Sequence, residues 1–216
     1  MQSSYFITGT DTNVGKTYIA SALVKHFVRA GYQAVGMKPI ASGCNLTPDG
    51  ELLNDDVLAL RAASNVSAPL DLINPYRFAP AIAPHIAAEQ TGQDIDCTQI
   101  MQAYQHLATL ADIVVVEGAG GFLVPLNAQH TIADLAVMLN IPIILVVGMR
   151  LGCINHALLT VEAIQARGLT LTGWVANQVD SEMPVFAENL VTLQQRIAAP
   201  CLGVVGWQQE ASFSFS

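Results

Sequence analysis

Six short apolar segments alternate with helical patterns, and this alternation constrains the fold more than any other feature of the sequence. The segments are Tyr5-Phe6-Ile7 and residues 33–40, 112–121, 141–148, 171–177 and 201–206. Helical periodicity follows the first segment and recurs over residues 56–64, 131–140 and 154–168. Near-continuous apolar strands are typical of a parallel sheet covered on both faces. The sequence therefore predicts an α/β doubly wound fold with a mainly parallel sheet and helices on both faces.

The composition agrees with one well-packed domain. The chain has 216 residues, of which 52% are hydrophobic and 12% are charged, and this is enough apolar surface for a large core. We therefore expect a single domain over residues 1–216. The net charge is −8 and no segment concentrates Lys and Arg, so nucleic acid is not an expected partner.

Cysteine spacing and the N-terminal segment bear on the compartment. Cys44, Cys97, Cys153 and Cys201 form no C-x-x-C pair, which argues against a zinc site or a redox dithiol. Reduced cysteines are the expectation for a cytoplasmic protein. The sequence shows no basic region followed by a long apolar run, and no apolar run approaches the length of a membrane span. We expect a cytoplasmic protein with no membrane partner.

The segment "GTDTNVGKT" between the first strand and the first helix has the features of a phosphate-binding loop, but with one extra residue. The usual spacing is Gly, four residues and Gly-Lys-Ser/Thr, whereas five residues separate Gly9 from Gly15. A preceding strand and a following helix provide the context that such a loop needs. Gly15 lets backbone amides approach phosphate oxygens, and the helix start adds partial positive charge. We expect Lys16 to contact the β- and γ-phosphates and Thr17 to hold Mg²⁺.

Carboxylates are the second requirement of nucleotide chemistry, because Mg²⁺ prefers hard oxygen ligands. Glu117 ends an apolar strand and is a candidate ligand. Asp55 and Asp56 begin a predicted helix, where either side chain can serve as an N-cap instead. The residues alone do not choose between the two aspartates.

Polar residues and glycines directly follow the predicted strands. Ligands of open parallel sheets bind beyond the carboxyl ends of the strands, so these residues form the predicted binding rim. They are residues 9–17, Lys38 with "PIASG", Glu117 with "GAGG", "GMRLGCINH" at 148–156, Asn177, and "GWQQE" at 206–210.

Seven stretches of the chain, in order, resemble the dethiobiotin synthetase family. They are "YFITGTDTNVGKT", "GMKPIASG", "NDDVLAL", "NPYRFAPAIAPH", "VVVEGAGG", "LGCINHALLT" and "GWVANQV". Relatives share the lengthened phosphate loop, so the unusual spacing is a trait of the family. The resemblance covers most of the chain, and a combination of seven stretches is far more specific than Gly-Lys-Thr alone.

The resemblance implies an ATP- and Mg²⁺-dependent ligase of biotin biosynthesis that closes a ureido ring on 7,8-diaminononanoate with CO2. One amine and CO2 give a carbamate, whose oxygen attacks the γ-phosphate to form a carbamic–phosphoric anhydride. The second amine then closes the ring, giving dethiobiotin, ADP and phosphate. The reacting groups near the γ-phosphate are anionic, so catalysis is expected to rest on positioning and charge stabilisation.

The resemblance also implies roles for single residues. Lys16 and Lys38 are implied to act on the reacting phosphate and carbamate, and Thr17, Asp56 and Glu117 to hold Mg²⁺. The match therefore favours Asp56 over Asp55. The implied ATP contacts are Asn13, Val14, Gly15, Lys16, Thr17, Tyr18, Asp56, Glu117, Gly118, Ala119, Gly120, Asn177, Gln178, Gly206, Trp207, Gln208 and Glu210.

A second set is implied to contact the diamine substrate: Lys38, Ser42, Leu151, Gly152, Cys153, Ile154 and Asn155. The last five begin a predicted helix, whose free amides would hold the substrate carboxylate across the interface of a homodimer. His156 beside them is expected to cap or pack the helix rather than to act as a base.

Two positions depart from the family pattern. Position 13 is Asn where many relatives have Glu, and residues 206–216, "GWQQEASFSFS", replace the Pro-Trp-Leu and longer tail of relatives. Two other classes remain as alternatives: a different ATP-dependent ligase on the same core, and a partitioning-type switch ATPase. The former would lack "PHIAAE" and "LGCINH", and the latter typically has a second lysine in its phosphate loop, where "TDTNV" has none.

Overall fold

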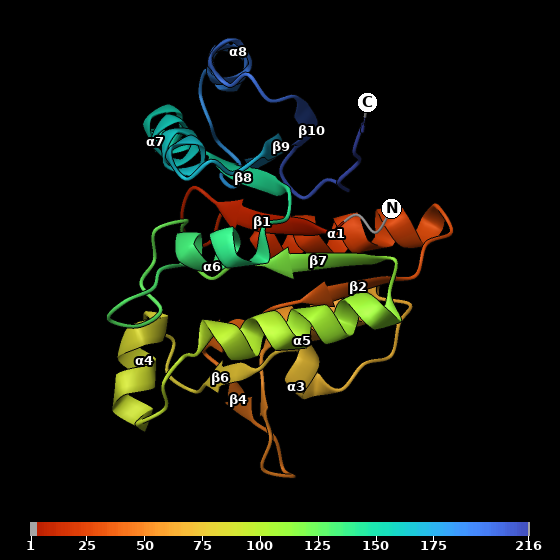
Figure 1. Cartoon of the computed structure of the whole chain (residues 1–216). Coiled ribbons are helices and arrows are strands. Elements are labelled where there is room, and N and C mark those ends of the chain that lie inside the picture. Colours follow the sequence, from red (N-terminus) through yellow and green to blue (C-terminus); the bar gives the residue numbers. More distant parts are fainter. Residues whose placement is uncertain (1–3, 216) are drawn as a thin grey trace.

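The computed structural model describes residues 4–215 and is built around a six-stranded parallel sheet (Figure 1). Its strands are β1 (Tyr5–Gly9), β2 (Ala34–Met37), β7 (Ile113–Glu117), β8 (Ile143–Met149), β9 (Leu171–Gln178) and β10 (Cys201–Val205). The strand order is β10-β9-β8-β1-β7-β2, and all neighbouring pairs are parallel. The predicted fold class and the six predicted strands are confirmed.

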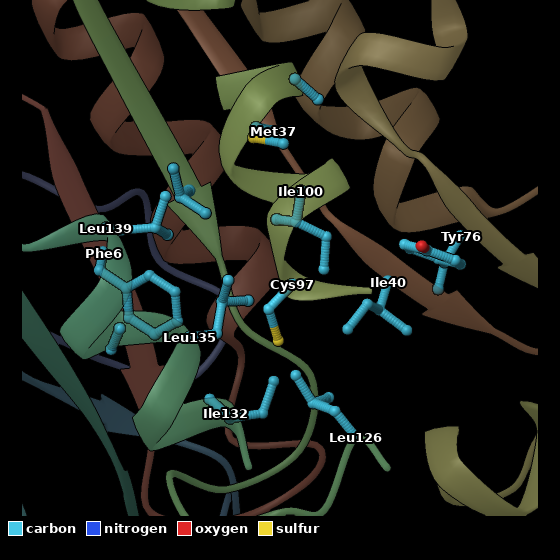
Figure 2. Packing of buried hydrophobic residues seen from close by; sticks show 14 of the residues in the cluster. Phe6, Met37, Ile40, Tyr76, Cys97, Ile100, Leu126, Ile132, Leu135 and Leu139 are labelled. Atoms are coloured by element: carbon cyan, nitrogen blue, oxygen red, sulfur yellow. The ribbon is translucent and has the colours of Figure 1, made fainter. Parts of the chain in front are cut away.

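Helices cover both faces of this sheet, which explains why its strands are apolar at successive positions. Ile7 packs with α1 (Lys16–Arg29) and α2 (Asp55–Ala63) on one face. Phe6 lies on the other face, where Figure 2 shows Leu135 and Leu139 of α6 (Ile132–Leu139) near its ring. Further along this second face, α7 (Cys153–Ala166) and α8 (Phe186–Arg196) pack around the buried Trp174.

Two predicted strands run well past the ends of the observed strands. The segment 33–40 leaves the sheet after Met37, since Pro39 has no N–H to donate to a neighbouring strand. Beyond it, β3 (Ile40–Ser42) pairs with β6 (Tyr76–Phe78) in a separate two-stranded sheet. The segment 112–121 is a strand only to Glu117, and its glycines form a turn.

The segment 74–90 contains the predicted short helix, α4 (Pro84–Thr91), but also the unpredicted strand β6. The smaller elements are α3 (Leu70–Ile73) and the hairpin of β4 (Asn45–Leu46) with β5 (Leu52–Leu53).

Two helices of the second layer were absent from the prediction. One is α5 (Cys97–Leu110), whose buried residues Cys97, Ile100, Ala103 and Leu107 repeat at helical spacing. The Asp96 carboxylate accepts a hydrogen bond from the Thr98 amide and caps this helix. The other is α8, in which Phe186, Leu190 and Leu193 repeat at helical spacing and pack into the cluster around Trp174. Over residues 4–215, no helix has both the length and the apolar character needed to cross a membrane.

Candidate active site

A cleft of about 910 Å³ lies at the carboxyl ends of β1 and β7. The chain order in the sheet reverses at β1, between β8 and β7, and ligands of doubly wound sheets bind at such a switch point. The lining residues come from the phosphate loop and from the segments after β2 and β7. They are Thr12, Asn13, Gly15, Lys16, Thr17, Tyr18, Lys38, Ile40, Ser42, Asp56, Ala81, Ile82, Ala83, Pro84, Glu117, Ala119, Gly120 and Val124.

The phosphate loop is held tightly at its last glycine. Gly15 has φ of 86° and is the N-cap of α1. The Asn177 amide nitrogen donates to the Val14 carbonyl at 2.9 Å, and a Cβ at Gly15 would lie 2.2 Å from that nitrogen. Glycine is therefore required twice, by the left-handed backbone and by the close approach of Asn177. Asn13 also has a positive φ, of 59°, in the same loop.

Lys16 is folded back onto its own loop. Its Nζ donates to the carbonyl of Asp11 at 2.9 Å, and the side chain is 7% exposed. Burial lowers the pKa of Lys16 to about 8, and the Lys38 charge adds to this, while Glu117 opposes it. An anion that enters the cleft would stabilise the charged form of Lys16.

Lys38 lies between two carboxylates at the centre of the site. Its Nζ donates to Glu117 Oε1 at 2.8 Å and also to Asp56 Oδ2. The Thr17 hydroxyl donates to the same Glu117 oxygen at 2.7 Å. Burial opposes the charge on Lys38, but Glu117 and Asp56 outweigh it, so the pKa of Lys38 is raised. Lys38 is 7% exposed, so it is a buried cation and not an exposed lysine at the end of a strand.

The backbone around Lys38 explains its orientation. The Lys38 amide donates to the Ile73 carbonyl at 2.9 Å, and its carbonyl accepts from the Asn74 side chain at 2.6 Å. The end of α3 therefore holds the residue just where β2 leaves the sheet. This anchoring directs the side chain into the cleft.

The structure also separates the two aspartates. Asn54 caps α2 and accepts a hydrogen bond from the Asp56 amide at 3.0 Å, which excludes the alternative that Asp55 or Asp56 is the N-cap. Asp55 is exposed, whereas Asp56 lines the cleft and meets Lys38. For Asp56, burial is outweighed by Lys38, so its pKa is lowered.

The donor set of the cleft fits Mg²⁺. Among residues 4–215, no hydrogen-bond partner is found for the buried Glu117 Oε2 atom. A buried carboxylate oxygen without a partner is costly unless a cation or donor reaches it. Glu117, the Asp56 carboxylate and the Thr17 hydroxyl together offer the hard oxygen ligands that Mg²⁺ takes alongside water and phosphate.

The remaining predicted ATP residues divide into two groups. Ala119 and Gly120 line the cleft, and Gly118 beside them donates its amide to the Ile7 carbonyl at 2.9 Å. Gln178 and residues 206–210 lie outside the cleft lining. They contact each other, since the Trp207 amide donates to Gln178 Oε1 at 3.2 Å. Asn177, at the end of β9, connects this second group to the phosphate loop.

The predicted substrate residues divide in the same way. Ser42 lines the cleft, and its buried hydroxyl has no hydrogen-bond partner within the described chain. Residues 151–155 do not line the cleft, and Leu151 is 99% exposed. Gly152, with φ of 92°, is the N-cap of α7, and His156 is exposed. Among the residues that the structure describes, no side-chain hydrogen bond caps the start of α7, and the expectation for His156 stays a prediction.

Sequence reasoning missed two parts of the site. One is the wall formed by Ala81 to Pro84, for which Pro84 at the first turn of α4 was the available signal. The other is the Asp11 carbonyl that holds Lys16, together with the ion pair between the Asp11 carboxylate and Arg150. The ion pair joins residues 139 positions apart in the sequence, so no local pattern predicts it.

These features together define a P-loop nucleotide-binding protein: a phosphate loop between a strand and a helix, with lysines and carboxylates around one cleft. Its fold resembles the septum site-determining protein MinD of Pyrococcus horikoshii, with a TM-score of 0.59, 15% identity and coverage of 95% of this chain and 82% of that one. The cell division protein FtsY of Thermotoga maritima gives 0.56, at 14% identity, covering 100% of this chain and 66% of that one. The family model described as AAA domain matches residues 3–213.

Closer relatives identify the family. The chain is 54% identical over 202 residues to the ATP-dependent dethiobiotin synthetase BioD of Aromatoleum aromaticum, covering 94% of this chain and 89% of the relative. It is 50% identical over 204 residues to that of Cellvibrio japonicus, with coverage of 94% and 89%. The chain belongs to the dethiobiotin synthetase family, as the seven stretches of sequence predicted.

Proposed function

We propose that this protein is an ATP-dependent dethiobiotin synthetase, which closes a ureido ring on 7,8-diaminononanoate with CO2 and releases ADP and phosphate. The observation that carries the proposal is the cluster of charged and polar side chains at the phosphate loop of a chain of this family: Lys16, Thr17, Lys38, Asp56 and Glu117. Both signs of charge are available there for a reaction between anionic groups. The whole chain, residues 1–216, would act as one domain in the cytoplasm, where ATP is supplied.

The two lysines would stabilise different negative charges. Lys16 would exchange the Asp11 carbonyl for the β- and γ-phosphates, helped by the backbone amides at the start of α1. Lys38 would lie between the γ-phosphate and the carbamate, offsetting their mutual repulsion. Its two carboxylate partners keep it charged, so the cation is present before the substrates arrive.

Thr17, Asp56 and Glu117 would hold Mg²⁺. When bound, the ion supplies positive charge to the β- and γ-phosphate oxygens. Glu117 Oε1 already accepts hydrogen bonds from Thr17 and Lys38, which leaves Oε2 for this role.

The chemistry would run in three steps within the cleft. One amine of the diamine adds to CO2 and loses a proton, giving a carbamate. A carbamate oxygen then attacks the γ-phosphorus and ADP leaves, giving a carbamic–phosphoric anhydride. The second amine attacks the carbonyl carbon, the C–O bond to phosphate breaks, and phosphate and a proton are released. The protein contributes mainly alignment of the attacking oxygen with the phosphorus and stabilisation of charge.

Further contacts follow from the family pattern. The phosphates and ribose would be surrounded by Asn13, Val14, Gly15 and residues 118–120, and Tyr18 would contact ATP on its nucleoside side. The base would be contacted by Asn177, Gln178, Gly206, Trp207, Gln208 and Glu210. Their support is geometric: Asn177 binds the phosphate loop through Val14, and Gln178 binds the turn at Trp207. Ser42, with its unpartnered hydroxyl in the cleft, would contact the diamine.

The substrate carboxylate would be bound by residues 151–155 of a second copy, in a homodimer. Within one chain these residues do not line the cleft, so they need a partner to act on it. Leu151, the first of these residues, is fully exposed and is the type of apolar side chain that an interface would bury.

The test is coupled turnover. Purified protein is incubated with ATP, Mg²⁺ and bicarbonate, with and without 7,8-diaminononanoate. Dethiobiotin is measured by mass spectrometry and ADP by a coupled assay. We expect dethiobiotin and ADP in equal amounts, and little ADP without the diamine. ADP formation that is independent of the diamine, with no dethiobiotin, would refute the ligase and favour a switch ATPase.

A further inference from the structure

The segment 206–215 follows the last strand and is attached along the edge of the sheet. The Ser214 amide donates to the Leu202 carbonyl of β10 at 2.9 Å. The backbone also passes very close to Gly203, where a Cβ would lie 2.6 Å from the Ser212 carbonyl oxygen. This part of the chain, which departs from the family pattern, is therefore a structured strap and not a loose tail.

Aromatic side chains anchor the end of the strap on β1 and α1. The Phe215 ring lies 5.9 Å from Tyr5 and 5.6 Å from Phe27, between ring centroids. The Phe213 ring meets His26 edge-on at 6.1 Å. Such contacts contribute beyond simple burial, so the strap has a defined position relative to α1.

Tyr18 connects the strap to the nucleotide cleft. Its hydroxyl donates to the Gln209 carbonyl at 2.6 Å and accepts from the Ala211 amide at 3.2 Å. Tyr18 directly follows Thr17 and lines the cleft, so these two bonds join the start of α1 to the strap.

The turn at 206–210 is thereby fixed at both ends. On one side the Trp207 amide donates to Gln178 of β9, and on the other Tyr18 holds Gln209. Within the turn, the Gln209 amide donates to the Gly206 carbonyl at 3.0 Å. Gln208 has a positive φ of 55°, a conformation that a non-glycine residue adopts only when its surroundings hold it.

We propose that Tyr18 is a positioning residue for base recognition, acting with the aromatic anchor of Phe213 and Phe215 to hold the turn 206–210 in its binding conformation. The inference rests on the base contacts assigned to this turn under the proposed function. A turn already held in place loses less conformational entropy when the base binds. The strap therefore raises the affinity for the base portion of ATP and leaves the affinity for the triphosphate portion unchanged.

The experiment compares two ligands on the full chain by calorimetry with Mg²⁺: ATP, and inorganic tripolyphosphate, which has no base. The variants are Tyr18→Phe, which removes both hydroxyl hydrogen bonds, and Phe215→Ala, which weakens the anchor. The control is Tyr32→Phe, because Tyr32 has nearly the same exposure as Tyr18, 47% against 46%, and does not line the cleft. Melting temperatures are recorded for every variant.

We expect Tyr18→Phe to weaken ATP binding about fivefold to tenfold, the range for one or two lost hydrogen bonds. Phe215→Ala should act in the same direction, tripolyphosphate affinity should stay unchanged in both, and the control should match wild type. A Tyr18→Phe variant with unchanged ATP affinity, or with equal losses for both ligands, would overturn the inference. Dethiobiotin formation by the wild type is measured separately. Its failure, with the ATP-selective effect intact, would refute the proposed function alone.

Discussion

Replacing Lys38 by Met tests the electrostatic core of the site most directly. The substitution keeps most of the apolar stem and removes the charge between Glu117 and Asp56. Losing one preorganised electrostatic contact typically lowers kcat by 10²–10³. ATP binding should weaken far less, because the phosphate loop with Lys16 remains.

The structure adds a second consequence for this variant. Glu117 is 1% exposed, and without Lys38 the one hydrogen-bond donor left to its carboxylate among residues 4–215 is the Thr17 hydroxyl. Breaking a buried ion pair by removing one partner costs on the order of 3–5 kcal/mol. We therefore expect the ligand-free variant to unfold at a clearly lower urea concentration. Saturating Mg²⁺ and ATP should recover part of the loss, since a cation then reaches Glu117.

The assay separates these effects. kcat is measured with saturating diamine and ATP, ATP affinity by calorimetry, and stability by urea titration with and without Mg²⁺-ATP. Lys25→Met is the matched control, because Lys25 is exposed on the same chain and does not line the cleft. An unchanged kcat would refute the role of Lys38. A loss of ATP affinity as large as the loss of rate would make Lys38 a nucleotide ligand instead.

Three further predictions address the metal, the pH dependence and the assembly. Glu117→Gln keeps an Oε1 acceptor for Thr17 and Lys38 but loses the negative charge. Turnover should therefore show a kcat at least 10²-fold lower, and circular dichroism should show an intact fold. Normal activity at ordinary Mg²⁺ concentration would remove Glu117 from the site. Lys16 has its pKa lowered to about 8 in the folded state, from 10.5. Between these two pH values the unfolded chain binds more protons than the folded chain. The free energy of unfolding of the wild type, compared with that of Lys16→Met, should therefore rise by about 3 kcal/mol from about pH 8 to pH 10.5 in urea titrations. A parallel pH dependence in the two proteins would contradict the burial of that charge. Leu151→Asp should convert the proposed dimer into monomers in light scattering and lower dethiobiotin formation; a dimer that survives the change would place the interface elsewhere.

Some features of this protein follow from local sequence alone. An unbroken apolar run flanked by glycine and polar residues has few structural solutions, so all six strands of the sheet were predictable. The phosphate loop was equally predictable, because Gly15, Lys16 and Thr17 act through local geometry at a helix start. The same reasoning missed α5 and α8, although the apolar residues of both helices repeat at helical spacing.

Other features depend on contacts between distant segments, which no local pattern contains. The family match favours Asp56 over Asp55, but the physical reason is that Asp56 faces Lys38, 18 residues away in sequence. The charge state of Lys38 depends on Glu117, which arrives from another strand of the sheet. The strap is fixed by Tyr18, 191 residues from Gln209. Local propensity acts over a few residues, whereas burial, pKa shifts and ion pairs depend on distances in space, and these exist only once the sheet has brought its strands together.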